Sequence, residues 1–527
     1  MSLRAALLTP TATAIVYCFC FVALGAGIAI AGPSILQFSI ATGESVNKVG
    51  YILGLRSLAY LAGGFMGFAF DKVPGHYLLA GGLAVGGIAT LMTPLARSLG
   101  ALAVCLIIQG FFLCVIDSGT TVMLLWLMEG NPYMSVWLQA LHFCFAAGAF
   151  LAPLALRASA AAAFARAGVA SSSNSHGNGA EILIEVPGAY DAAWYAVGGF
   201  CGVCAFVLFF CLPPARRRKG DVEQIAETAT KATSDVRGDA SAGTSWDRAI
   251  LASTGAVSDG WDTAACSVAP ASSANTVAVA TLTSDAVAVE AGEPIVEVVT
   301  VIEAATLRSV QLQAWSVVIN VSTLFAFYVG CEVGFGLFLT AFAVIALGMP
   351  EGDAQYMTSA YWGAIMIGRF IAIPLSTKLK ASTMLTLDVA GIQVFFVVLV
   401  LLIVSGAAQS GVWVAIVLFG LCMASVYPTA VTLLERYVPL EGKHSTSLVI
   451  GGSAGEWFFP FIIASFMQAD VEGGTAIAVS AEEALRARWV FLGVNAFCCA
   501  GMLLSYTILL RLGPALRARR EALGIKK

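Results

Sequence analysis

The sequence predicts an all-α membrane protein with twelve transmembrane helices in two six-helix pseudo-repeats, and three observations support this fold. Hydrophobic residues make up 59% of the chain and charged residues only 11%, whereas a soluble globular protein carries about 25% charged residues. Apolar stretches of about 20 residues, the length of a helix that crosses a bilayer, follow one another along the chain. Segments of the first half also recur in the second half.

Twelve apolar stretches are expected to span the membrane. They cover residues 12–36, 47–70, 77–96, 99–128, 134–156, 190–212, 313–347, 355–376, 383–407, 411–434, 445–467 and 487–511. Residues 157–189 should form an outside loop. Residues 213–312 are rich in Ala, Ser, Thr and Asp and poor in aromatic residues, a composition that buries too little surface to fold alone. We therefore expect a disordered cytoplasmic linker over 213–312, between an N-terminal bundle over 1–212 and a C-terminal bundle over 313–527.

The positions of Lys and Arg predict the orientation, because these residues concentrate in cytoplasmic loops. Basic residues follow the second, sixth, eighth and twelfth spans. They are Lys72, Arg216, Arg217, Arg218, Lys219, Lys378, Lys380, Arg517, Arg519, Arg520, Lys526 and Lys527. With twelve spans all of them fall on one side of the membrane. The N- and C-termini should therefore be cytoplasmic.

Two gapless alignments predict that the halves are repeats of one another. Gly110–Leu125 aligns with Leu418–Leu433, and Gly148–Pro153 aligns with Gly455–Pro460 at nearly the same offset. Repeated halves are common in membrane transporters, where the substrate site lies near the midplane at the interface between the repeats.

The most informative residue is Glu332, in the stretch AFYVGCEVGFG near the middle of the seventh span. A charge at the centre of a membrane helix costs about 2.5–3.5 kcal/mol on insertion scales, so such a residue serves a transported ion, a substrate or a buried partner. Two interpretations remain open. Either Glu332 accepts hydrogen bonds from sugar hydroxyls or carries a coupling ion, or it forms an internal ion pair or packs in protonated form. Tyr328, one helical turn away, is a candidate for stacking on a sugar ring.

Other polar residues within the spans extend the candidate site. Asp117, in the fourth span, is either an ion-coupling carboxylate or a partner of Arg56 or His142. Gln139 and His142 are three residues apart in the fifth span and so share one helical face. The candidate substrate-binding residues are Glu332, Tyr328, Trp362, Gln139, His142, Glu456 and Asn495, and the candidate ion-coupling residues are Asp117 and Glu332.

Charged residues near the span ends are either simple stop signals or gating residues. The gating candidates are Asp71, Lys72, Glu435 and Arg436, together with Arg369, which is also a candidate partner for a buried carboxylate. The sequence contains no spacing typical of metal ligands and no nucleotide-binding motif. We therefore expect no metal, no cofactor and no nucleic-acid partner, and an ATP-driven pump or an enzyme is disfavoured.

Several motifs resemble the major facilitator superfamily. Gly67-x-x-x-Asp71-Lys72-x-x-Gly75-His76 resembles the loop motif that this family carries between spans two and three. Four further segments are similar to its branch that holds fucose permease and the sodium-dependent glucose transporters. They are YVGCEVGFG (328–336), QALHFCFAAGAFLAPL (139–154), Ile116-Asp117-Ser118 and SAYWGAIMIGRFIAIPL (359–375).

The resemblance implies the major facilitator fold and a carrier that moves a monosaccharide by alternating access, with H⁺ or Na⁺ as a coupling ion. It implies that Asp117 matches the span-four carboxylate of fucose permease and that Glu332 matches the acidic residue of the span-seven motif. Span one carries only Gln37, where fucose permease has an aspartate. The alternatives are an organic-ion or drug antiporter of the same fold, or a non-transporting receptor or scaffold. The expected partners are a sugar and the lipid bilayer, and we expect a monomer in the plasma membrane.

Overall fold

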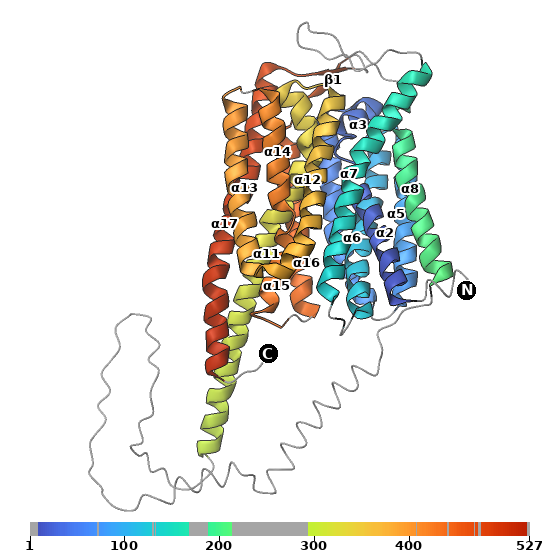
Figure 1. Ribbon diagram of the computed structural model, residues 1–527. Helices are drawn as coiled ribbons and strands as arrows, with labels where there is room; N and C mark the ends of the chain where they lie inside the picture. The colour runs from blue at the N-terminus through green and yellow to red at the C-terminus, as the bar shows by residue number, and fades with distance from the viewer. Residues whose placement is uncertain are drawn as a thin grey trace, which may run out of the picture. The chain divides into compact units, whose positions relative to one another are not determined.

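The computed structural model of the protein describes residues 9–70, 73–128, 131, 133–167, 188–212, 294–406, 408–439, 442–467, 469–472 and 476–523. These residues form a bundle of long helices and one antiparallel pair of short strands, β1 (Asp470–Glu472) and β2 (Ala476–Ala478) (Figure 1). Residues Met1–Arg216 and Thr306–Lys527 belong to one structural unit, which contains every contact described below. The predicted all-α membrane fold is confirmed.

The helices correspond to the predicted spans in order. The N-terminal half contains α2 (Pro10–Ala29), α3 (Ile35–Thr42), α4 (Val46–Gly63), η1 (Gly64–Ala69), α5 (Gly75–Met92), η2 (Thr93–Leu95), α6 (Leu99–Leu127), α7 (Met134–Ala167), α8 (Asp191–Phe206) and η3 (Val207–Cys211). The C-terminal half contains α11 (Pro294–Leu347), α12 (Glu351–Lys378), α13 (Ala381–Val404), α14 (Gln409–Met423), α15 (Val426–Glu435), α16 (Gly442–Phe466) and α17 (Ala481–Ala522).

Within the described residues, eleven segments are long and apolar enough to cross a membrane. The remaining predicted span is the eighth, 355–376, which corresponds to α12; this helix is more polar than these segments yet lies inside the bundle. It packs against α14 of its own half and against α7 of the other half. Its charged residue Arg369 is buried. The polarity of α12 is therefore directed into the protein, where it can serve a site between the halves.

Two segments are helical where the sequence predicted irregular structure. The prediction of a loop from Arg157 is wrong for its first part, because α7 continues to Ala167. That extension is rich in alanine, the best helix-forming residue. The expected disordered linker over 213–312 is likewise helical from residue 294, since α11 begins at Pro294, and proline is favoured at the first position of a helix. Residues 168–187 and 213–293 lie outside the described part of the chain.

Pro428 divides the tenth predicted span into α14 and α15. Proline has no N–H group, and its ring clashes with the carbonyl four residues earlier, so a continuous helix does not pass through this position. The carbonyl at that position belongs to Ala424, and Met423 lies in the last turn of α14, where carbonyls lack helical partners. The break therefore leaves two main-chain acceptors available to side chains.

The repeat is also visible in helix packing. Gly148 of α7 and Gly455 of α16, which are aligned in the sequence repeat, both lie where two helices of one half approach closely. A Cβ atom on Gly148 would lie 2.0 Å from the carbonyl oxygen of Val22, and one on Gly455 would lie 1.8 Å from that of Ala326. Only glycine allows backbones to approach so closely, as at many helix crossings in membranes. The pairs α2–α7 and α11–α16 are therefore equivalent crossings in the two halves.

Gly455→Ala should destabilise the protein, because the added methyl group would push α16 away from α11. Overpacking of this kind costs about 1–3 kcal/mol. Gly493→Ala is the matched control, since a Cβ atom at that helical position meets nothing within 4 Å. Thermal unfolding of the purified variants in detergent should show a lower midpoint for Gly455→Ala alone. Equal midpoints for the two variants would contradict the close crossing.

Candidate functional site

The centre of the site is an ion pair between Glu332 on α11 and Arg369 on α12. Nη2 of Arg369 lies 2.7 Å from Oε1 of Glu332, and the two side chains are 3% and 7% exposed, Arg369 first. A buried carboxylate needs such a partner, because removing an unpaired charge from water costs several kcal/mol. The internal ion pair, one of the two interpretations of Glu332, is thus present.

Arg369 connects three parts of the bundle. Its Nε donates a hydrogen bond to the carbonyl oxygen of Ala424 at 3.2 Å, which is the acceptor freed by Pro428. Its Nη1 donates to the carbonyl oxygen of His142 on α7 at 2.9 Å. Because α7 belongs to the N-terminal half and α12 to the C-terminal half, Arg369 hydrogen-bonds across the interface. It therefore lies at the centre of the site. Its predicted gating role was grouped with charges near the span ends, where Arg369 does not lie.

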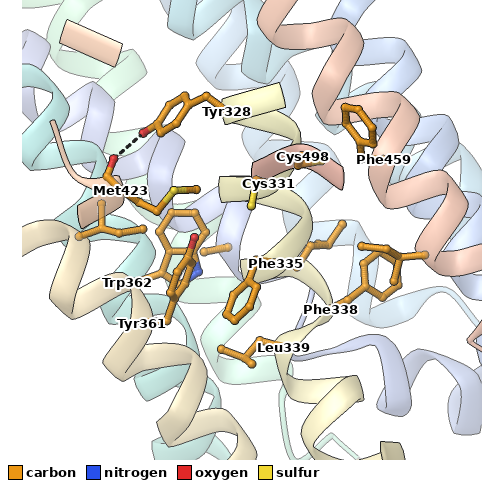
Figure 2. Packing of buried hydrophobic residues seen from close by; sticks show 14 of the residues in the cluster. Tyr328, Cys331, Phe335, Phe338, Leu339, Tyr361, Trp362, Met423, Phe459 and Cys498 are labelled. Carbon is orange, nitrogen blue, oxygen red and sulfur yellow. Dashed lines mark hydrogen bonds between the residues drawn. The ribbon is translucent and has the colours of Figure 1, made fainter. Parts of the chain in front are cut away.

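Aromatic residues of the C-terminal half surround this ion pair. The hydroxyl of Tyr328 donates to the carbonyl oxygen of Met423 at 3.0 Å, the second acceptor at the helix break (Figure 2). The hydroxyl of Tyr361 donates to the main-chain oxygen of Glu332 at 3.1 Å. Figure 2 shows Tyr361 and Trp362 side by side near Phe335. These contacts hold α11, α12 and the α14–α15 break in one fixed arrangement.

Two buried polar atoms on α12 and α7, the helices that Arg369 joins, lack partners. Trp362 is 1% exposed, and its ring lies against Gly336, one helical turn from Glu332. Within the described residues, the indole Nε1 of Trp362 forms no hydrogen bond. The side-chain oxygen Oε1 of the buried Gln139 also forms none. Buried polar groups in proteins are nearly always hydrogen-bonded, so each exception needs an explanation. A bound polar solute would supply the missing donor and acceptor.

The N-terminal half contributes a second buried network. Arg56 of α4 donates from Nε to Oε1 of Gln109 at 3.0 Å and from Nη2 to the carbonyl oxygen of Gly27 at 2.8 Å. Gln109 in turn donates to Oγ1 of Thr90 at 2.9 Å. These bonds hold the Arg56 guanidinium group within its own half.

Asp117 has a different partner from the two that the sequence suggested. The hydroxyl of Tyr60 donates to Oδ2 of Asp117 at 2.6 Å, and within the described residues neither Arg56 nor His142 is hydrogen-bonded to it. The His142 ring instead packs on Tyr427, with ring centroids 5.5 Å apart. Tyr427 belongs to α15, so this contact also joins the two halves. A sequence pattern would not find Tyr60, because 57 residues separate it from Asp117.

The remaining candidates for substrate binding differ in their surroundings. Glu456 of α16 is 4% exposed, and within the described residues its carboxylate forms no hydrogen bond or ion pair. The charges of Arg56, Asp117 and Glu332 nevertheless act on it, so it belongs to the same cluster. Asn495 is satisfied inside its own half, since it donates to the carbonyl oxygen of Phe491 at 2.8 Å.

Apart from Arg369, the predicted gating residues form no side-chain hydrogen bond or ion pair within the described part of the chain. Asp71 and Lys72 lie outside the described residues, and Glu435 and Arg436 are exposed at the end of α15. A polar cluster that the sequence did not reveal joins the halves where α12 begins. Its centre is the buried Glu351, which accepts hydrogen bonds from Nε2 of Gln37 and from the hydroxyl of Tyr190, each at 3.2 Å.

The comparison with protein families decides the identity of this fold. A sequence model of the Major Facilitator Superfamily matches residues 17–455. The chain belongs to the major facilitator superfamily. The bundle described above is therefore a major facilitator fold.

Relatives in the superfamily are similar over most of the chain. Human "Sodium-dependent glucose transporter 1" is 26% identical over 457 residues, which cover 84% of this chain and 70% of that protein. Mouse "Sodium-dependent glucose transporter 1A" is 25% identical over 455 residues, covering 84% and 86%. Human "Major facilitator superfamily domain-containing protein 4A" is 32% identical over 141 residues, covering 27% of each chain.

Solved structures share the fold at low sequence identity. The proton:xylose symporter XylE bound to 6-bromo-6-deoxy-D-glucose is 12% identical, with a TM-score of 0.58 over 94% of each chain. The xylose transporter XylE from E. coli in a partially occluded inward open conformation is 11% identical, with a TM-score of 0.56 over 93% of this chain and 96% of that one. These likenesses confirm the superfamily fold.

Replacing one partner of the central ion pair should lower the stability of the protein more than replacing both partners. Arg369→Met leaves an uncompensated carboxylate and should lower stability by about 3–5 kcal/mol, whereas replacing both partners in Glu332→Leu/Arg369→Met should restore much of that loss. The control is Arg517→Met, which breaks the exposed pair with Glu521 and should leave the stability nearly unchanged, because water screens exposed ion pairs. Thermal unfolding in detergent measures all three. A double variant less stable than Arg369→Met would contradict the expected recovery of stability.

Proposed function

We propose that the protein is a secondary transporter that moves a monosaccharide by alternating access, coupled to H⁺ or Na⁺. The observation that carries the proposal is the buried Glu332–Arg369 pair, which reaches the other half through His142. The unpartnered polar atoms of Trp362 and Gln139 lie on the two helices that Arg369 joins, α12 and α7. The names of the relatives, which are sodium-dependent glucose transporters, support a hexose-like substrate. No catalytic group is part of the proposal.

The chemistry of the site suits an uncharged polyol. Glu332 and Arg369 neutralise each other, so the pair presents hydrogen-bonding groups with no net charge to attract an ion. Arg369 uses one of the several lone-pair sites of the Glu332 carboxylate. Sugar hydroxyls donate and accept equally well, and so match an acceptor at Glu332 or Gln139 and a donor at Trp362. The rings of Tyr328, Tyr361 and Trp362 offer apolar faces for a pyranose ring.

Alternating access follows from which contacts join the halves. Arg369 bonds to the main chain of α7 at the centre, and Glu351 bonds to Gln37 and Tyr190 at the end where α12 begins. Rocking of one half against the other would break the Glu351 cluster and open that end. Glu351 therefore replaces Glu435 and Arg436 as our proposed gating residue. We further propose that the termini are cytoplasmic and that the protein acts as a monomer in the plasma membrane.

The proposal is tested by counterflow of labelled hexoses in proteoliposomes that contain the purified full-length protein. Preloaded unlabelled sugar should drive accumulation of the label, and D-glucose analogues should compete. Competition by organic cations instead of sugars would favour the antiporter alternative. Absence of counterflow with every sugar and cation tested would overturn a transport function and favour a receptor or scaffold.

Trp362→Phe should weaken sugar binding without abolishing transport. The substitution retains a ring and removes the Nε1 donor, so it should cost about 0.5–1.5 kcal/mol, which corresponds to about a two- to tenfold higher KM. Trp489→Phe is the matched control, because Trp489 is exposed on α17. Concentration dependence of counterflow measures both. An unchanged KM for Trp362→Phe would exclude the indole N–H from the site.

Glu351→Leu should shift the population towards the state that is open at the end where α12 begins. The variant removes the shared acceptor of Gln37 and Tyr190, and each lost hydrogen bond is worth about 0.5–1.5 kcal/mol. Distances between spin labels on α3 and on the first turn of α12, measured by electron paramagnetic resonance, should lengthen relative to the unsubstituted protein. Glu521→Leu, at an exposed carboxylate, should leave them unchanged. Identical distance distributions would remove Glu351 from the gate.

A further inference from the structure

Glu456 is a buried carboxylate for which the described chain provides no direct partner. Its side chain is 4% exposed, and no hydrogen bond or ion pair within 4.0 Å reaches it from the described residues. The other carboxylates of the cluster are held differently, since Glu332 is paired with Arg369 and Asp117 accepts a hydrogen bond from Tyr60. A bare carboxylate at this depth is expensive, so its charge must be balanced in some other way.

Arg56 is the positively charged group that acts on Glu456, and within the described residues the two form no ion pair. The two residues lie on α4 and α16, which pack against each other across the interface between the halves. Their charges attract, but two of the Arg56 nitrogens already donate to Gln109 and Gly27 within the N-terminal half. Arg56 and Glu456 therefore attract each other without a direct hydrogen bond or ion pair.

The charges around Glu456 do not balance. The groups that act on it are Arg56 on α4, Asp117 on α6 and Glu332 on α11, and Tyr60 and Cys114 face the same region as ionisable but neutral groups. With Arg369 paired to Glu332, the cluster holds three carboxylates and two guanidinium groups, while the His142 ring packs between Phe21 and Tyr427. When all three carboxylates are ionised, the two guanidinium groups leave one negative charge unbalanced.

We propose that a monovalent cation, H⁺ or Na⁺, binds at Glu456 and balances this negative charge, which makes Glu456 the coupling residue of the carrier. The proposal rests on the proposed transport function and reassigns a residue that the sequence suggested as a sugar ligand. A cation on Glu456 weakens the attraction to Arg56, whereas its release strengthens that attraction and draws α4 towards α16. Occupancy of Glu456 thereby controls how strongly the two halves hold together along this interface.

The test uses Glu456→Gln, which mimics the neutralised carboxylate with nearly the same shape. In proteoliposomes, sugar counterflow without an ion gradient should persist, while accumulation driven by an ion gradient should be lost. One arm imposes a Na⁺ gradient at equal pH on both sides, and the other imposes a pH gradient in Na⁺-free medium. The gradient that drives sugar accumulation by the unsubstituted protein identifies the coupling cation. Glu521→Gln, at an exposed carboxylate on α17, is the matched control and should behave like the unsubstituted protein.

A second measurement does not depend on transport. In detergent and without sugar, the unfolding midpoint of the unsubstituted protein should rise with added Na⁺ or with falling pH, because a ligand that binds the folded state stabilises it. Glu456→Gln should lose that response, and Glu456→Asp should keep it at a different cation concentration. The measurement also shows whether each variant folds.

The outcomes separate the two proposals. If Glu456→Gln accumulates sugar under the same gradient as the unsubstituted protein, or keeps the cation-dependent stabilisation, the cation site is not at Glu456. If Glu456→Gln folds but loses counterflow, Glu456 contacts the sugar and the present assignment is wrong. If the unsubstituted protein shows no counterflow of any sugar, the proposed transport function fails, and the stability measurement still decides whether a cation binds at Glu456.

Discussion

The structure of the site depends on one constraint, which is that a carboxylate buried at the depth of Glu332 must be neutralised and hydrogen-bonded. Arg369 provides the opposite charge, but a guanidinium group has five N–H donors and needs several acceptors. The chain supplies them with main-chain oxygens, at Ala424 and at His142. Pro428 matters for this reason, because it interrupts the tenth span where an acceptor is required. A proline on one helix, an arginine on a second and a glutamate on a third thus form one electrostatic unit.

The same constraint explains why the two halves contact each other through polar groups at their centre. Apolar side chains gain little by associating within a membrane, because lipid is equally apolar. Arg369 reaches α7, Arg56 faces Glu456, and Glu351 collects donors from the opposite half. Contacts of this kind have defined geometry and can be broken and remade. They suit an interface that must open on either side.

The fold could be predicted from the sequence to a large extent, and the pairing within the site could not. Twelve helices could be predicted because the hydrocarbon core of the bilayer fixes the length of a spanning helix and requires apolar residues along it. The helices follow the predicted spans in order. The charge of Glu332 and Arg369 indicated a buried site for the same reason. Their mutual pairing, and the choice of Tyr60 for Asp117, depend on which helix faces meet in space. The Glu351 cluster could not be predicted from the sequence, because Gln37 and Glu351 are 314 residues apart and only the folded bundle places them together.

The two glycine crossings have a consequence for where the molecule can deform. At Gly148 and Gly455 the backbones of paired helices are in direct contact, so neither pair can slide or tilt without a clash between main-chain atoms. Relative motion of the two helices is therefore restricted at each of these crossings. Within each half, the paired helices should therefore move together as one rigid body when the halves rock.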